Sequence, residues 1–475
     1  MQPAIFPGTA LVLPALIATA CAINPATGNR QLSLIGESQE IRMGTEADGE
    51  ISGQMGIYPD QALAKIVTDM GKGLAAKSER PDLPWSFRIV DEPVVNAFAL
   101  PGGYIYVTRG ILAYMNSHGE LAAVLGHEIG HVTARHSVNQ MSKAQLTGIG
   151  LNVGAALDSR VAHYAGLTGA GFGLLFLKFG RDDERQADDL GLRYMRSAGH
   201  AGESMMEMFR MLGAVSGGRN SRSVPGWLST HPDPENREER IRAQLPGASD
   251  ALPEDTAWLR LLEGLVFSDD PRQGFFRENR FLHPDLAFRL DFPAGWKTAN
   301  ARQSVSAKQP DGKAIIQITL VSEQTPAAAA AKFFAPAELQ RGAPWRDSIS
   351  GLPTISAFFQ AGSGGESIAG LVAFVPHGGK VFRLLGATPA PDWQAQEGTV
   401  GAALASFARL TDVRDLGVTP YRLTLTAAGV TTTLAEFHRT HPSTVSLDEV
   451  ARINHLQPDS RVSRGMLIKR VVGGP

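Results

Sequence analysis

The sequence contains a single cysteine, little net charge and no long hydrophobic run. Because Cys21 has no second cysteine to pair with, an intramolecular disulfide is excluded. The 45 basic and 47 acidic residues give a formal net charge of −2, whereas nucleic-acid-binding domains are usually basic. The longest uncharged, apolar-leaning run, residues 164–177, has 14 residues and four glycines, which is too short and too interrupted for a membrane span. No transmembrane helix is therefore predicted in the mature chain, and no nucleic-acid partner.

The segment LGHEIGHVTARH, residues 125–136, places three histidines and a glutamate close together. His127 and His131 flank Glu128 in an H-E-x-x-H pattern, which is typical of zinc peptidases. An α-helix turns by about 100° per residue, so the two histidines lie one turn apart on one face. The pattern predicts two zinc ligands and a general base.

A peptidase zinc needs three protein ligands and an open fourth position. His136 follows His127 by nine residues, which is about 180° round a continuous helix. No glycine or proline interrupts residues 132–135. We therefore expect His136 on the far side of this helix, away from the metal, and seek the third ligand elsewhere.

The segment RDDERQADDLG, residues 181–191, offers a carboxylate ligand. Glu184 and Asp188 stand four apart and face the same way from one predicted helix. With Glu184 on the zinc, Asp188 can accept the N–H of a ligating histidine and raise its basicity. The alternative is a charged, solvated helix face. Because residues 181–191 follow the H-E-x-x-H helix, we favour the interpretation of Glu184 as a ligand.

The rest of the pattern predicts an α+β multidomain chain. Helices are expected over about 38–77, 118–141, 181–197, 203–213 and 234–245, and strands within 85–93 and 96–112. Asp233 is the expected N-cap of the helix that starts at Pro234, and Thr325 is the expected cap of a further helix that starts at Pro326. The glycine-rich residues 145–179 are expected to form a packed or mobile flap, and residues 246–256 a linker. The predicted divisions are a signal peptide over 1–20, a peptidase domain over 22–245, a small α+β domain over 268–411 and a terminal module over 416–475.

The N-terminus resembles an export signal. Residues 10–20, ALVLPALIATA, are apolar and end in small residues directly before Cys21. This stretch is too short to span a bilayer but suits a signal-peptide core. The cysteine after Ala-Thr-Ala resembles a bacterial lipobox, which predicts lipidation of Cys21 and a periplasmic chain anchored to the outer membrane. The alternative is an ordinary cleaved signal with a chance cysteine.

Four motifs together resemble one known family. They are NAFALPGG, HEIGHVTARH, RDDERQADDLG and STHPDPENR, in the expected order and spacing between residues 22 and 270. They are similar to those of the HtpX/BepA-like family of gluzincin metallopeptidases. The resemblance implies a mainly helical zincin-type domain with a small sheet. It also implies one zinc ion held by His127, His131 and Glu184, with Glu128 as the base.

The same resemblance implies roles for residues outside the ligand set. His231, just before a predicted helix, either donates to the oxyanion of the tetrahedral intermediate or occupies the open zinc position as an inhibitory fourth ligand. The resemblance assigns Arg237 as the positively charged partner of His231. A helix-capping histidine and a solvated arginine are the alternative. Asn96, Ala97 and Phe98 resemble the edge strand that pairs with an extended substrate, although a plain core strand fits the sequence equally.

The C-terminal residues 420–471 resemble a divergent LysM module of βααβ order, a type that binds peptidoglycan, but they lack the usual Pro-Gly-Asp-Thr turn. Together these features predict an exported zinc endopeptidase for envelope protein quality control. Its expected partners are polypeptide substrates, outer-membrane assembly components and peptidoglycan. The competing hypothesis is a weakly catalytic chaperone or cell-wall adaptor, which the presence of both base and ligands disfavours.

Overall fold

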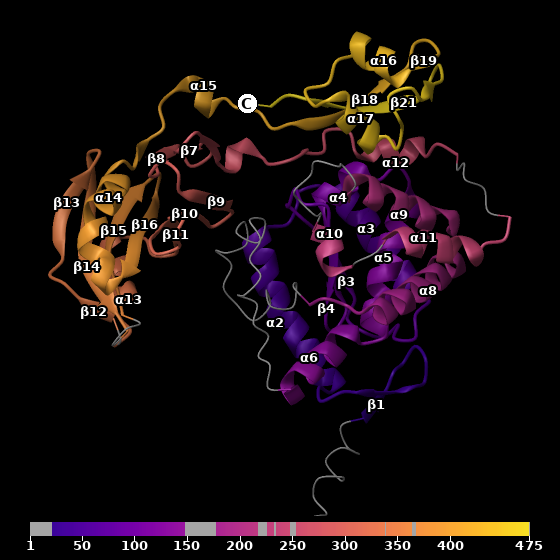
Figure 1. The fold of residues 1–475 in the computed structure, drawn as a ribbon, viewed down its shortest axis with the longest axis horizontal. Coiled ribbons are helices and arrows are strands. Elements are labelled where there is room, and N and C mark those ends of the chain that lie inside the picture. Colours follow the sequence, from indigo (N-terminus) through magenta and orange to yellow (C-terminus); the bar gives the residue numbers. More distant parts are fainter. Residues whose placement is uncertain are drawn as a thin grey trace, which may run out of the picture. The chain divides into compact units, whose positions relative to one another are not determined.

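The computed structural model of the chain describes residues 21–147, 177–216, 226–231, 234–247, 253–337, 339–362 and 367–474. These residues form two units (Figure 1). The first contains the described residues up to Ser268 together with Arg422–Val472, and the second contains Asp269–Tyr421. Both units combine helices with strands, so the chain is an α+β multidomain protein.

The first unit carries the H-E-x-x-H segment. Its elements are, in chain order, β1 (Cys21–Ile23), β2 (Arg30–Leu32), α2 (Glu37–Met55), α3 (Gln61–Ala75), β3 (Ser86–Val90), β4 (Ala97–Leu100), β5 (Tyr104–Thr108), α4 (Arg109–Tyr114), α5 (His118–Thr133), α6 (His136–Thr147), α8 (Arg181–Ser197), α9 (Glu203–Ser216), α10 (Gly226–Thr230), α11 (Pro234–Ala243), α12 (Thr256–Leu261), β18 (Arg422–Ala427), β19 (Thr432–Thr433), α16 (Leu434–Thr440), α17 (Leu447–Ile453), β20 (Arg461–Val462) and β21 (Leu467–Val472). The helices predicted over 181–197, 203–213 and 234–245 are confirmed as α8, α9 and α11.

The N-terminal helical pattern divides into two helices. Helix α2 ends at Gly56, whose φ of 74° is a left-handed conformation that favours glycine. Helix α3 begins after Asp60, whose side chain accepts a hydrogen bond from the Leu63 amide. A backbone break and a new N-cap therefore separate what the apolar pattern predicted as one helical stretch.

A three-stranded sheet lies beside the helices, in the order β3–β5–β4. Strand β5 runs parallel to β3 and antiparallel to β4, so β4 is an edge strand of this sheet. The predicted strand region over 96–112 is correct as far as Thr108. The hydroxyl of Thr108 then accepts a hydrogen bond from the Ile111 amide and caps helix α4, so the last predicted strand residues are helical.

The predicted continuous helix over 118–141 is wrong. Helix α5 begins after Ser117, whose hydroxyl accepts a hydrogen bond from the Glu120 amide, and ends at Thr133. Arg135 adopts a φ of 60°, and helix α6 starts at the next residue. The chain therefore changes direction between the second histidine of the motif and His136.

The C-terminal segment belongs to the first unit. Strands β18 and β21 pair antiparallel, with helices α16 and α17 between them in the chain, which is the predicted strand–helix–helix–strand order. The buried ammonium of Lys469 donates to the carbonyls of Ala113 at 2.8 Å and Met115 at 3.0 Å. The Tyr114 hydroxyl donates to Glu449 at 2.5 Å. The segment therefore packs against the residues that lead into α5.

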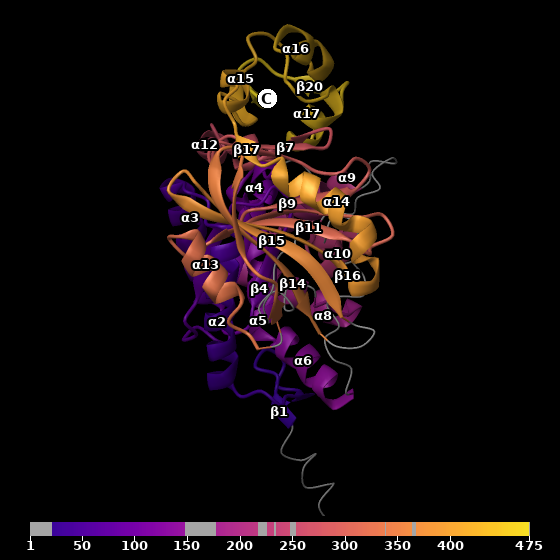
Figure 2. The ribbon, with the colours of Figure 1, turned by 90° about the vertical axis from the view of Figure 1, so that its left-hand side faces the viewer.

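The second unit is built around a large antiparallel sheet (Figure 2). Its elements are η2 (Pro271–Gln273), β6 (Phe275–Arg277), β7 (Arg280–His283), β8 (Phe288–Asp291), β9 (Lys297–Ala301), β10 (Ser304–Lys308), β11 (Ile315–Val321), α13 (Pro326–Phe333), β12 (Leu339–Arg341), β13 (Trp345–Ile349), β14 (Leu352–Ala361), β15 (Ile368–His377), β16 (Lys380–Pro389), η4 (Ala390–Asp392), α14 (Trp393–Ala405), β17 (Ala408–Arg409) and α15 (Val413–Leu416). The sheet order is β12–β14–β15–β16–β11–β10–β9, with β13 also on β14, and a second sheet runs β17–β8–β7–β6.

Both faces of the large sheet are covered. Along β15, Val372 and Phe374 pack with the alanines of α13, while Ala373 and Val375 pack with α14 and the smaller sheet. Successive strand side chains point to opposite faces, so the two helices lie on opposite sides. Helix α13 begins as predicted, because the Thr325 hydroxyl accepts a hydrogen bond from the Ala328 amide.

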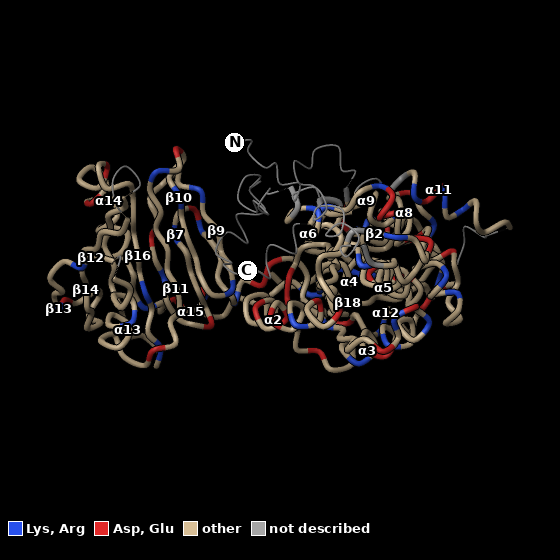
Figure 3. The backbone as a smooth tube through the Cα atoms, turned by 90° about the horizontal axis from the view of Figure 1, so that it is seen from below, with Lys and Arg blue, Asp and Glu red and all other residues tan. Residues whose placement is uncertain are grey.

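Acidic and basic residues are scattered over both units (Figure 3). None of the helices that the structure describes is long and apolar enough to cross a membrane. The predicted signal peptide, most of the predicted flap over 145–179 and the Asp233 helix cap lie outside the described residues, and so does the Cys21 side chain.

Candidate metal centre

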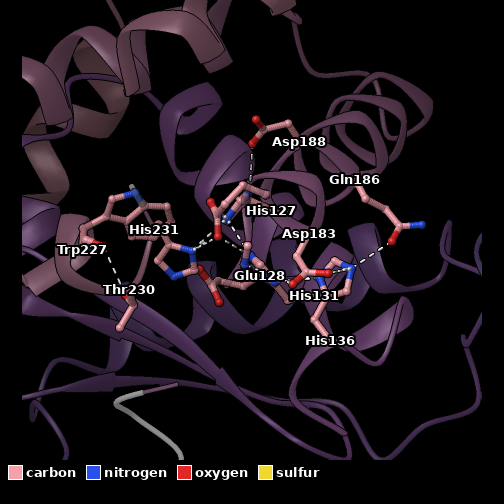
Figure 4. Close-up of polar contacts among 12 residues, drawn as sticks. His127, Glu128, His131, His136, Asp183, Gln186, Asp188, Trp227, Thr230 and His231 are labelled. Atoms are coloured by element: carbon pink, nitrogen blue, oxygen red, sulfur yellow. Dashed lines mark hydrogen bonds and ion pairs between the residues drawn. The ribbon is translucent and has the colours of Figure 1, made fainter. Parts of the chain in front are cut away.

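The first unit brings four ligand-type side chains to one point. Three of them, His127, His131 and His231, are labelled in Figure 4. His127 and His131 come from α5, Glu184 from α8, and His231 from the residue after α10. Their ligand atoms all lie within 4.8 Å of one another, and all four side chains are buried. The Nε2 atoms of the two α5 histidines are 3.0 Å apart and lie 3.6 and 3.5 Å from the Glu184 carboxylate.

Small residues let α5 and α8 approach closely enough to form this group. A β-carbon on Gly191 would lie 2.8 Å from the His127 amide nitrogen, and one on Gly130 would lie 2.8 Å from the Ala187 carbonyl oxygen. Real β-carbons essentially never approach backbone atoms so closely. The backbones of the two helices are therefore nearly in contact, and Glu184 on α8 reaches the two histidines on α5.

Asp188 and Arg237 support one side of the group. His127 Nδ1 lies 3.0 Å from Asp188 Oδ1. Arg237 donates to both oxygens of Asp188, at 2.6 and 2.9 Å, and its Nη1 lies 2.9 Å from Glu184 Oε2. A bidentate guanidinium of this kind holds a carboxylate at a defined angle. Arg237 from α11 thus links the predicted ligand Glu184 to the predicted supporting carboxylate Asp188.

His136 lies beside the group, not on the far side of the helix as the continuous-helix argument predicts. Because the chain turns at Arg135, the His136 ring is buried and its Nδ1 is 2.9 Å from Nδ1 of His131. Its Nε2 is 2.9 Å from Gln186 Oε1 (Figure 4). His136 is not a member of the four-residue ligand group, so its exclusion as a ligand agrees with the geometry although the reason given for it was wrong.

Glu128 faces the same group from α5. Its carboxylate is buried, and Oε1 has no hydrogen-bond partner among the described residues. His231 Nε2 lies 3.6 Å from this oxygen. Burial raises the pKa of Glu128 to about 7. A buried carboxylate oxygen that lacks a partner and titrates near neutral pH is suited to hold a proton from a reacting water.

The charge states of the donors suit zinc. Burial lowers the pKa of His127 to about 3, so its ring is neutral and can offer a lone pair. Burial alone would raise the pKa of Glu184, but the facing His231 and His131 outweigh it and hold the pKa below its usual range. Two imidazoles and one carboxylate are a donor set of catalytic zinc sites, and the partnerless Glu128 oxygen fits a bound water nearby.

Two aromatic side chains that the sequence did not single out hold His231 and His131. Trp227 stacks on His231 with ring centroids 4.4 Å apart. Phe179 packs on His131 at 4.1 Å, and its amide donates to the Thr230 carbonyl at 3.4 Å. Trp227 stands four residues before His231, a helical spacing that offered a weak signal. Phe179 offered none, because only the tertiary fold brings it to the histidines.

The predicted substrate strand adjoins the helix that precedes His231. The Trp227 amide donates to the Val95 carbonyl at 3.1 Å, next to the start of β4. The side chains of Ala97 and Phe98 are buried, and Phe98 stacks on Tyr106 at 4.9 Å. Asn96 Oδ1 is buried without a hydrogen-bond partner in the described part of the chain. Of these three residues, only Asn96 has a side chain that is partly exposed.

Two histidines from one helix, a glutamate from the next and a buried glutamate between the histidines define a zinc metallopeptidase of the H-E-x-x-H class. Residues 61–245 match Peptidase family M48, so this part of the chain is similar to the metallopeptidase domains of that family.

Several curated proteins are similar to this domain. The beta-barrel assembly-enhancing protease of Escherichia coli (strain K12) is 29% identical over 221 residues, which cover 45% of this chain and 45% of that protein. The mitochondrial metalloendopeptidase OMA1 of Schizosaccharomyces pombe is 30% identical over 233 residues, covering 47% and 66%. The metalloprotease YcaL of Escherichia coli is 28% identical, covering 38% and 68%. The chain spans about half the length of the first of these relatives.

Among solved structures, cyanobacterial PsbP from Synechocystis sp. PCC 6803 is 12% identical, with a TM-score of 0.24, and the match covers 27% of this chain and 91% of that one. A score this low supports no conclusion about fold or function.

Proposed function

We propose that this chain is an exported zinc endopeptidase that hydrolyses peptide bonds of polypeptides. The observation that carries the proposal is the buried convergence of His127, His131 and Glu184 beside Glu128, whose Oε1 lacks a partner among the described residues. Ligands and base come from two helices whose backbones are nearly in contact, so their geometry is preorganised by the fold.

The arrangement supports hydrolysis by a general-base route. A zinc ion held by His127, His131 and Glu184 would polarise the scissile carbonyl and lower the pKa of the attacking water towards about 7. Glu128 Oε1 takes a proton from the water as its oxygen bonds to the carbonyl carbon. The same carboxyl then gives the proton to the leaving nitrogen as the C–N bond breaks. Arg237, charged and buried beside Glu184, keeps the ligand carboxylate ionised through this cycle.

We propose the free edge of β4 as the substrate-binding strand. An extended polypeptide that pairs with this edge would be recognised mainly through backbone hydrogen bonds. The burial of Ala97 and Phe98 supports a backbone-only contact, and the partnerless amide oxygen of Asn96 provides one additional acceptor. Such a site favours unfolded or misassembled segments over folded domains.

We further propose that His231 holds the enzyme in a resting state. His231 Nδ1 lies 3.3 Å from His127 Nε2 and 2.9 Å from Glu184 Oε1, a position that supports its role as an inhibitory fourth ligand. The other role, donation to the oxyanion of the intermediate, requires His231 to leave the ligand group.

For the cellular role we propose envelope protein quality control, with the chain lipid-anchored to the outer membrane through Cys21. The relative named for beta-barrel assembly supports outer-membrane assembly components as partners. The strand–helix–helix–strand order of residues 422–472 supports a LysM-like module that binds peptidoglycan. Cys21→Ser should release the chain from membranes as a soluble exported form. A wild-type chain found in the soluble periplasm would contradict the anchor but not export.

The central experiment combines zinc analysis with casein cleavage. Wild type should hold one zinc ion and cleave casein. Glu128→Gln should keep the zinc and lose about 10²- to 10⁴-fold in turnover, because only the base is removed. Glu239→Gln, an exposed glutamate on α11, is the matched control and should behave as wild type. Residual activity of Glu128→Gln above about a tenth of wild type would point to another base. A wild type that binds zinc without cleaving would favour the adaptor function.

A further inference from the structure

The two α5 histidines are supported by different outer partners. Each turns Nε2 towards the ligand group and Nδ1 away from it. The Nδ1 of His127 meets Asp188, a carboxylate that Arg237 holds. The Nδ1 of His131 meets no carboxylate. It lies 2.9 Å from Nδ1 of His136, another imidazole.

One arrangement of protons satisfies this chain of contacts. A ligating Nε2 must be unprotonated, so neutral His131 carries its proton on Nδ1 and donates it. His136 must then accept at Nδ1 and carry its own proton on Nε2. That nitrogen is 2.9 Å from the Gln186 amide oxygen, which accepts. The hydrogen bonds therefore run in one direction, from His131 through His136 to Gln186.

The fold holds His136 in this place by contacts that are distant in sequence. Arg135 has a φ of 60°, which costs energy for a residue with a side chain. Its Nε donates to Glu40 at 2.9 Å and its Nη2 donates to the Ile35 carbonyl at 2.8 Å. These contacts from the N-terminal part of the chain maintain the turn that brings His136 back beside His131.

We propose that His136 is a positioning residue for the zinc ligand His131. It fixes the ring and the tautomer of His131 by accepting its Nδ1–H, and Gln186 fixes His136 in turn. The inference rests on the proposed zinc peptidase function, because it assigns a role to His136, the hydrogen-bond partner of the proposed zinc ligand His131. Loss of an outer hydrogen bond of this type usually weakens metal binding by about 10- to 100-fold.

The test measures the zinc dissociation constant of the metal-free full-length protein by competition with a chelator, together with its thermal midpoint without zinc. His136→Leu fills the space without an acceptor and should weaken zinc binding by about 10- to 100-fold. His136→Asn offers an amide oxygen near the position of Nδ1 and should restore most of the affinity. Gln186→Glu places a stronger acceptor at the end of the chain and should tighten binding.

A purely structural role gives a different pattern. His136 would then affect the thermal midpoint, while the leucine and asparagine variants would have equal zinc affinities, and this result would overturn the inference. If His136→Leu fails to fold, Gln186→Glu decides, because unchanged zinc affinity in that variant contradicts the relay. A wild type that binds no zinc would instead reject the proposed site itself. Zinc binding and casein cleavage in wild type with unaltered His136→Leu affinity would reject the relay alone.

Discussion

His231 Nδ1 lies 2.9 Å from Glu184 Oε1, so the histidine that follows α10 occupies the ligand group instead of facing away from it. Trp227 stacks on its ring, and the Phe179 ring lies 5.6 Å away. In the proposed zinc enzyme, an imidazole at this position would compete with water as a ligand. This relationship is the basis for the proposed resting state.

Replacing His231 with alanine should therefore raise activity. Without the imidazole, a water could bind to a zinc ion held by His127, His131 and Glu184, and Glu128 Oε1 could accept its proton. Initial rates of casein cleavage would be compared at equal zinc content, with His200→Ala as a control outside the ligand group. A fall of about 10²-fold would instead identify His231 as an oxyanion donor, since that is the scale for one lost donor. Unchanged activity would contradict both roles.

Replacing Glu184 with alanine should remove both zinc and activity. The variant keeps only two of the three protein ligands, and Arg237 loses one of its two carboxylate partners. The matched control is Asp182→Ala, because its side chain is 99% exposed on the same helix. Zinc content after dialysis, measured by mass spectrometry of the metal, tests whether Glu184 is the third ligand. Full occupancy in Glu184→Ala would show that the third ligand lies elsewhere.

Gly191→Ala should destabilise the first unit and weaken zinc binding. The added β-carbon would meet the His127 amide nitrogen at 2.8 Å and the Gly126 carbonyl carbon at 2.9 Å, and neither backbone atom can move without shifting α5. Overpacking of this kind costs about 1–3 kcal/mol. In Gly213→Ala on α9, the new β-carbon meets nothing within 4 Å, so stability should hold or rise by up to about 1 kcal/mol. Equal urea-unfolding midpoints for the two variants would contradict the close approach of α5 and α8.

Local patterns in the sequence were enough to predict the two helices that carry the ligands. The four-residue spacings of His127 with His131 and of Glu184 with Asp188 predict shared helix faces, and the structure places each pair on one helix. The cap of α13 at Thr325 is also a local signal, because a hydroxyl just before a helical run accepts an amide of the first turn.

The turn at Arg135 could not be predicted from neighbouring residues. It contains neither glycine nor proline, and its left-handed backbone is held by Glu40, 95 positions away in the chain. The stacking of Trp227 and Phe179 near His231 is likewise a consequence of tertiary packing. The position of His136 beside His131 follows from this turn, which is why a continuous helix misplaced it.

A buried carboxyl group on the helix that carries the motif, Glu120, interacts electrostatically with a buried amine of the C-terminal segment, Lys469. Burial raises the pKa of Glu120 on α5 to about 8, and the nearby Glu207 adds to the rise. Burial lowers the pKa of Lys469 on β21 to about 7, although Glu120 opposes this shift. His455, 3.9 Å from Glu120, has a pKa lowered to about 3 by burial and stays neutral above that pH.

The shifts of Glu120 and Lys469 contribute a minimum in the free energy of unfolding near pH 7 to 8. From about pH 4.5 to pH 8 the folded chain keeps a proton on Glu120 that the unfolded chain has lost, so the free energy of unfolding falls as pH rises. From about pH 7 to pH 10.5 the folded chain lacks a proton that the unfolded chain keeps on Lys469, so the free energy rises with pH. The free energy of unfolding of wild type minus that of the double variant Glu120→Gln/Lys469→Met, measured in urea from about pH 5 to pH 10, should show this minimum, because shifts common to both chains, such as that of His455, cancel. The same difference taken with Asp448→Asn, a change in α17 outside this pair, should be flat. A wild-type profile identical in shape to that of the double variant would show that the pair does not titrate in this range.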